Sequence, residues 1–206
     1  MEEASEVDGG ASGGDLARAR EAYRRRDWPT AHGRLVAVAR RVDLAPDDLA
    51  LLGDSAWWLG RVDESITAGE AAYAGFVAAD RPRPAAWAAM GVAVNLFLRG
   101  EHAPGAGWIQ RAGRLLAELP ECAEQGYLRY LVEVEAALDG PNPDEVITAA
   151  RGVADLGRRH GVPDLVAAGT LGEGRILVRQ GRVGEGMALL DEAMVAVLAD
   201  ELSPDW

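Results

Sequence analysis

The sequence predicts an all-α fold in which about five helical hairpins, ten helices in all, stack in a row. Three observations lead to this prediction. Gly60, Gly100, Gly140 and Gly181 recur about every 40 residues, and each follows an apolar run with helical spacing. The motif Gly-Arg-Val-x-Glu occurs at residues 60–64 and again at 181–185. No segment has the pattern of a β-strand. A period near 40 with one internal turn is typical of stacked helix pairs.

Residues 1–14 are predicted to form a disordered tail, because they are acidic, rich in Gly and Ser, and almost without apolar side chains. The repeat domain is then predicted over residues 15–206. Its first helix should begin at Asp15, and Asp27 should cap the second, with Pro29 in the first turn. Pro46 should open the third helix. The first five helices are predicted at about residues 15–26, 28–41, 46–59, 62–79 and 85–99.

The fifth helix is predicted to start only at Ala85, because Pro82 and Pro84 should keep the residues before them extended. Further along the chain, Pro120 should end the sixth helix. Asn142 should cap the eighth, which Gly161 should end. The remaining five helices are predicted at about residues 102–119, 123–138, 143–160, 163–180 and 183–202.

Small residues recur about five positions after predicted turns, where neighbouring helices would approach each other closely. They are Ala31, Ser65, Gly105 and Gly186. Glycine inside a helix costs about 1 kcal/mol relative to alanine, so close packing is the expected reason for the glycines at 105, 107, 172, 174 and 186. The period, the turns and these small positions resemble tetratricopeptide repeats. That resemblance implies a right-handed superhelix. The repeat unit in this chain is longer than the usual 34 residues.

The composition excludes several classes of function. A net charge of −12 disfavours both a nucleic-acid surface and an anionic membrane face. There is no secretory signal and no apolar run long enough to span a membrane, so a cytoplasmic location is predicted. All 21 basic residues are arginine, a bias typical of GC-rich bacterial genomes.

Few residues are candidates for metal binding or catalysis, so we predict no metal site, no cofactor and no catalytic activity. The histidines at 32, 102 and 160 are scattered, and Cys122 is the single cysteine. Two Gly-Glu-Gly segments, at 172–174 and 184–186, follow no strand and lack the rest of a phosphate-binding motif. The chain is therefore predicted not to be an enzyme.

Aromatic and polar residues at repeating positions can either fill the core between hairpins or line a concave groove, where stacked repeats hold peptides or ligands. The residues assigned to such a groove are Trp58, Trp87, Asn95, Tyr127, Tyr130 and Arg175. The last helix should expose apolar surface, because no hairpin follows to cover it. The predicted interface for self-association or partner docking consists of Met187, Leu190, Met194 and Leu198.

Several segments also resemble the helical-repeat region of large LuxR-type transcriptional regulators of GC-rich bacteria. They are residues 49–61, 70–73, 97–101, 107–108, 114–122 and 181–194. The resemblance implies a sensing or partner-binding role beside a separate helix-turn-helix that reads DNA. The chain stops before such a module, and no basic helix-turn-helix occurs in it.

The predicted function is therefore a non-enzymatic module that binds a protein, a peptide or a small effector in a regulatory setting, without binding nucleic acid or membrane. Two alternatives remain open at this point: a complete LuxR-like transcription factor, and a small-molecule enzyme that uses the concave groove.

Overall fold

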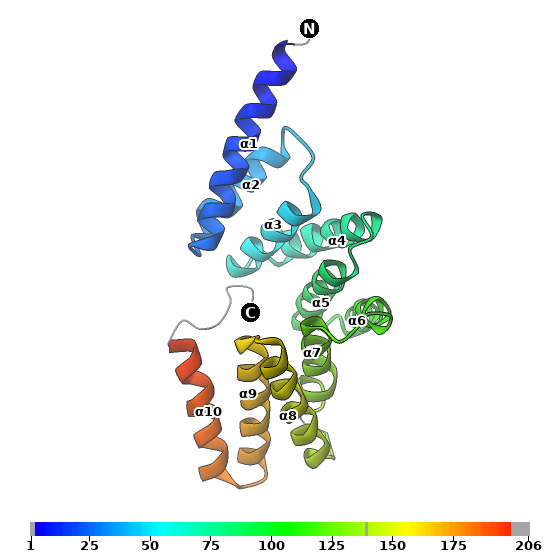
Figure 1. Ribbon diagram of the computed structural model, residues 1–206, viewed down its shortest axis with the longest axis vertical. Helices are drawn as coiled ribbons and strands as arrows, with labels where there is room; N and C mark the ends of the chain where they lie inside the picture. The colour runs from blue at the N-terminus through cyan, green and yellow to red at the C-terminus, as the bar shows by residue number, and fades with distance from the viewer. Residues whose placement is uncertain (1–2, 139, 199–206) are drawn as a thin grey trace. The chain divides into compact units, whose positions relative to one another are not determined.

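The computed structural model describes residues 3–138 and 140–198, which divide into two compact units with the boundary between Ala117 and Glu118 (Figure 1). The first unit contains α1 (Glu3–Arg24), α2 (Trp28–Ala39), α3 (Pro46–Trp58), α4 (Val62–Ala78), α5 (Pro82–Leu98) and α6 (His102–Ala117). The second contains α7 (Ala123–Arg129), the π-helix η1 (Tyr130–Glu135), α8 (Pro143–His160), α9 (Pro163–Arg179) and α10 (Val183–Leu198).

The predicted all-α class and the ten α-helices are confirmed, since no strand occurs in the described ranges. Within each unit, every helix packs against the next one along the chain, as stacked hairpins require. Fully buried aliphatic side chains fill the space between helices in both units, with Leu35 and Leu116 in the first and Leu165 and Ile176 in the second.

Six of the turns between helices share one backbone design. At the turn between α3 and α4, Gly60 adopts a left-handed φ of 70°. Its N–H donates to the Trp57 carbonyl at 2.9 Å, and the Arg61 N–H donates to the Ala56 carbonyl at 2.8 Å. This is the Schellman pattern, which satisfies the last carbonyls of a helix. The same pair of hydrogen bonds recurs where the left-handed residue is Arg26, Asp80, Gly100, Gly161 or Gly181.

These turns explain the 40-residue period as two helix-and-turn units of about 20 residues each, because Asp80 lies midway between Gly60 and Gly100. Each new helix begins two residues after the left-handed residue. All four glycines that define the predicted period lie between helices, as expected. Gly140 lies in the turn between η1 and α8, which also includes residue 139 outside the described part of the chain.

Two predicted helix starts were wrong. Helix α5 begins at Pro82, not at Ala85, because both prolines fit within the first turn, where no backbone N–H is needed. Helix α1 begins at Glu3, not at Asp15. Residues 3–14 contain no proline, and a helix once nucleated extends by one hydrogen bond per residue. The predicted disorder of residues 1–14 and the domain start at residue 15 stay predictions. The predicted end of the last helix, near 202, lies outside the described residues.

Most of the predicted small-residue contacts are confirmed. A Cβ at Gly105 would lie 2.5 Å from the Phe97 ring, and one at Gly186 would lie 2.7 Å from the carbonyl oxygen of Gly174. A Cβ at Gly172 would lie 2.6 Å from Val134 Cγ1, and one at Gly174 would lie 3.0 Å from the carbonyl oxygen of Gly186. Gly107 was assigned wrongly, because nothing lies within 4 Å of a Cβ placed there.

Candidate functional site

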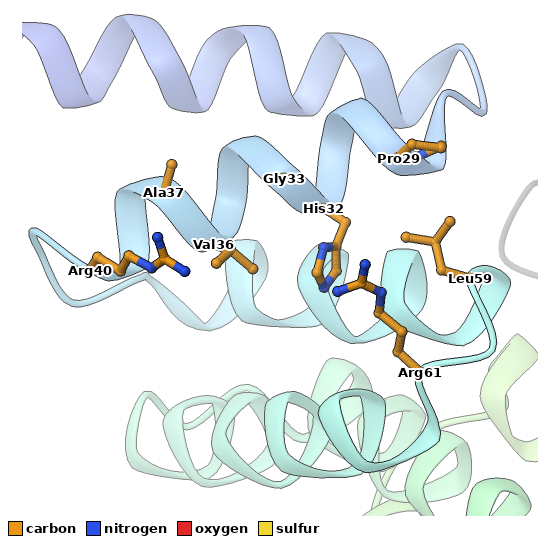
Figure 2. A pocket seen from close by; sticks show the side chains of 8 residues that line it. All are labelled: Pro29, His32, Gly33, Val36, Ala37, Arg40, Leu59 and Arg61. Carbon is orange, nitrogen blue, oxygen red and sulfur yellow. The ribbon is translucent and has the colours of Figure 1, made fainter.

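A surface pocket of about 360 Å³ lies in the first unit, between one face of α2 and the turn that joins α3 to α4 (Figure 2). We call it the α2 pocket. Its lining residues are Pro29, His32, Gly33, Val36, Ala37, Arg40, Leu59 and Arg61.

Local sequence signals position both walls of this pocket. Asp27 caps α2 by accepting the Thr30 N–H at 3.3 Å, and Pro29 occupies the first turn. The lining residues from 29 to 40 recur at intervals of three and four, which places them on one face of the helix. The opposite wall consists of Leu59 and Arg61, which flank the left-handed Gly60.

The pocket is locally cationic although the chain as a whole is acidic. His32 is only 5% exposed, and its Nε2 lies 2.7 Å from Oε2 of Glu64. Arg61 donates to the other oxygen of Glu64 at 3.3 Å. The hydrogen bond from His32 is the main reason that the pKa of the Glu64 carboxyl is lowered. Arg40 has no ion pair or hydrogen bond with any of the side chains that the structure describes.

Two tryptophans that directly precede lining residues of the pocket stack on each other. Trp28 and Trp58 lie nearly parallel, with ring centroids 5.6 Å apart, and Tyr23 packs edge-on against Trp28. Trp58 remains 47% exposed. Because Trp28 and Trp58 directly precede the lining residues Pro29 and Leu59, the stack and the pocket wall come from the same two segments.

The other residues assigned to a groove are dispersed. Trp87 is partly buried and Asn95 is buried in the first unit. The Asn95 amide donates to the Gly91 carbonyl and to Ser65 Oγ, and its Oδ1 has no hydrogen-bond partner among the described residues. In the second unit, Tyr127 and Tyr130 are also buried. Burial of these three favours the core alternative for them, and the groove prediction then depends on Trp58, Trp87 and Arg175.

The second unit has a polar cluster at its π-helix. The Tyr130 hydroxyl donates to Oε2 of Glu135 at 3.2 Å, and Arg175 donates to the same oxygen at 2.8 Å. Burial is the main reason that the pKa of Tyr130 is raised, to about 12. The sequence predicted one regular helix over 123–138, whereas residues 130–135 are wound as a π-helix, a form often found at functional sites.

The raised pKa of Tyr130 predicts a loss of stability in alkali. The unfolded phenol ionises near pH 10, so between about pH 10 and 12 the unfolded chain loses a proton that the folded chain keeps. The free energy of unfolding should therefore fall by about 2 kcal/mol across this window, and this contribution should be intact below it. Urea midpoints at about pH 9 and 11.5 should show a smaller drop in Tyr130→Phe than in the wild type. A Tyr73→Phe variant that reduces the drop equally would contradict this assignment.

Helix α10 carries the residues predicted as an interface. Met187, Met194 and Leu198 are 45%, 55% and 79% exposed, and Val195 next to them is 63% exposed. Leu190 is partly buried, because its side chain packs over Gly174 of α9. The predicted exposure therefore holds for three of the four residues.

Three further observations concern metal binding, the cysteine and membrane crossing. In the described ranges no group of three or more His, Cys, Asp and Glu side chains is placed to hold a metal ion. Cys122 is buried. No helix among the described residues is both long enough and apolar enough to cross a membrane.

Comparisons with known proteins identify the fold but not a family. No protein-family model matches the chain, and no curated protein sequence matches it. Solved structures do match, among them BtubC (BKLC) from P. vanneervenii, with a TM-score of 0.60, 14% identity, and coverage of 95% of this chain and 92% of that chain. A second match is a putative kinesin light chain from Podosopora anserina with nearly identical TPR-like repeats (TM-score 0.56, 14% identity, coverage 92% and 96%).

The chain has a tetratricopeptide-like fold. A substituted form of the Podosopora anserina protein agrees, with a TM-score of 0.58, 13% identity, and coverage of 91% and 95%. At these identities the likeness extends to the architecture of the repeats and not to ligands. The tetratricopeptide-like resemblance predicted from the period is thus confirmed.

Proposed function

We propose that this chain is a non-enzymatic interaction module, which uses its helical repeats to bind a protein partner. Stacked helical repeats present extended surfaces that suit such recognition. The tetratricopeptide-like fold supports an interaction role in general terms, and the partner must be inferred from the surface of the chain itself.

The observation that carries the proposal is the exposed apolar stripe on α10. Val183, Met187, Met194 and Leu198 recur at helical spacing, and each is at least 45% exposed. Exposed contiguous apolar surface typically marks an interaction site. Methionine suits such a surface, because its flexible thioether adapts to different partners. A second copy is the simplest occupant, since two such stripes can pair about a two-fold axis.

The regulatory setting is a finer part of the same proposal. The resemblance of several segments to LuxR-type regulators supports a role in the cytoplasm of a bacterium, where the module would sense or bind a partner of the transcription machinery. A small effector is a further candidate ligand. Direct contact with DNA is not part of the proposal, because the net charge of −12 opposes it.

Sedimentation velocity over a concentration series tests the proposed interface. The wild type should sediment faster as its concentration rises, whereas Met187→Glu/Met194→Glu should remain a monomer, because it places two carboxylates in the apolar contact. Leu98→Glu is the matched control, since Leu98 is 69% exposed on α5, and it should associate like the wild type. A wild type that stays monomeric, or a double variant that associates equally, would contradict self-association through α10.

A further inference from the structure

We propose that the α2 pocket binds an extended peptide segment that presents a carboxylate beside an aliphatic side chain. This inference rests on the proposed interaction function, and it names a second recognition site together with the chemistry that this site selects. Three features support it: the charge of the pocket, its apolar lining and a glycine among its lining residues.

The charge of the pocket favours a carboxylate. Arg40 and Arg61 extend toward the pocket from opposite sides, with His32 and Val36 between them (Figure 2). Glu64 already accepts from both His32 and Arg61. None of the described side chains pairs with Arg40, and we assign its guanidinium to the ligand. The planar fork of arginine matches a carboxylate, to which it can donate two parallel hydrogen bonds.

The remaining lining is apolar. Pro29, Val36 and Leu59 border the space on both of its walls. A volume of about 360 Å³ is at the lower end of the range for ligand sites, which suits one or two side chains of a peptide. A peptide with an acidic residue next to an aliphatic one could therefore place its carboxylate at Arg40 and its aliphatic side chain against the apolar lining.

Gly33 provides an observation that internal packing does not explain. It lies inside α2, where glycine is less favourable than alanine. A Cβ at this position would meet nothing within 4 Å, so no neighbouring helix requires a glycine. Gly107 inside α6 is equally open, so it is the place of Gly33 in the lining of the pocket that links it to a ligand. Since Gly33 lines the pocket, a side chain there would project into the space that a ligand needs.

The test uses the full chain and a defined probe. The probe is an N-acetylated, C-amidated hexapeptide of alternating leucine and glutamate, titrated to millimolar concentration and followed by the methyl NMR signals of Val36 and Leu59. The twin peptide, with glutamine in place of glutamate, should bind at least about tenfold more weakly, because it lacks the charge that Arg40 recognises. Equal affinity for the twin, or no shift with the glutamate peptide, would overturn the proposal.

Four variants locate the binding. Gly33→Leu fills the pocket and Arg40→Glu reverses its free charge, and each should weaken binding at least about tenfold. Gly107→Leu and Arg114→Glu on α6 are the matched controls, since residue 107 has open space for a side chain and Arg114 has no described partner. Both controls should bind within about twofold of the wild type. Undiminished binding by Gly33→Leu would overturn the proposal, and circular dichroism checks that each variant is folded.

Two further outcomes separate this inference from related ones. Hexanoate that shifts the same methyl signals with an affinity equal to the peptide would assign the pocket to a small aliphatic acid and overturn the peptide proposal. The interaction function proposed for α10 can fail or succeed separately. If Gly33→Leu still self-associates like the wild type while peptide binding is absent from both, the α10 interface stands and the α2 pocket assignment falls.

Discussion

Replacing Gly169 by alanine is expected to lower the free energy of unfolding by about 3 kcal/mol, the largest single effect that the packing predicts. Gly169 lies on α9 at its contact with α8. An added Cβ would lie 2.4 Å from the Ala150 carbonyl oxygen and 2.7 Å from the Ala154 nitrogen. These are backbone atoms, which cannot rotate away, so the two helices would have to separate and lose contacts along their length. Urea denaturation at neutral pH measures the change.

The matched control for this substitution is Gly107→Ala on α6. Nothing lies within 4 Å of a Cβ at residue 107, and alanine favours a helix more than glycine does. This variant should therefore be as stable as the wild type or up to about 1 kcal/mol more stable. If Gly169→Ala also proved neutral, the close approach of α8 and α9 would be wrong.

Replacing Arg20 by alanine is expected to lower the free energy of unfolding by about 2 kcal/mol. Both oxygens of Asp48 accept from the Arg20 guanidinium at 2.8 Å, and this pair joins α1 to α3. The Asp48 side chain is 1% exposed, so loss of Arg20 leaves a buried carboxylate without its cation. Because Arg20 itself is half exposed, the expected cost is below that of a fully buried pair.

Arg24→Ala is the control for the loss of an arginine from the same helix. Arg24 pairs with Glu21 one turn away, and both side chains are exposed. Exposed pairs of this kind contribute about 0.5 kcal/mol or less, so the urea midpoint should hardly move. Equal losses for Arg20→Ala and Arg24→Ala would show that the Asp48 pair is not the reason for the effect.

The sequence contains the signals for most helix boundaries. Proline in the first turn predicted the starts of α2 and α3, and both helices have proline at their N-terminus. Glycine predicted the turns at Gly60, Gly100 and Gly181 for a physical reason, since a left-handed residue without Cβ is unstrained. Asp80 and Arg26 adopt the same left-handed conformation at other turns, and their residue types do not indicate it.

The structural features that the sequence did not reveal depend on what lies opposite a residue in the folded chain. Gly107 and Gly169 are both glycines inside helices, but one faces open space and the other faces a backbone. The π-helix over 130–135 was missed because the apolar positions of that segment fit a regular helix as well.

The candidate sites were predictable in part. Met187, Met194 and Leu198 of α10 are exposed, as predicted from the sequence. The α2 pocket was missed, because its lining comes from two separate segments and uses ordinary residue types. One signal was available: Gly33 interrupts an otherwise regular helix without a turn nearby. For Trp58 and Trp87, no sequence signal separates a groove residue from a core residue.

The central claim is that the exposed stripe of α10 is the surface through which this module binds a partner. Site-specific photocrosslinking in intact cells tests it most directly, with a benzophenone side chain placed at Met194 and, as the control, at Leu98. Both side chains are more than half exposed, so the probe reaches solvent at either position. We expect a discrete crosslinked product from position 194 and none from position 98. No product from position 194, or the same products from both positions, would contradict it.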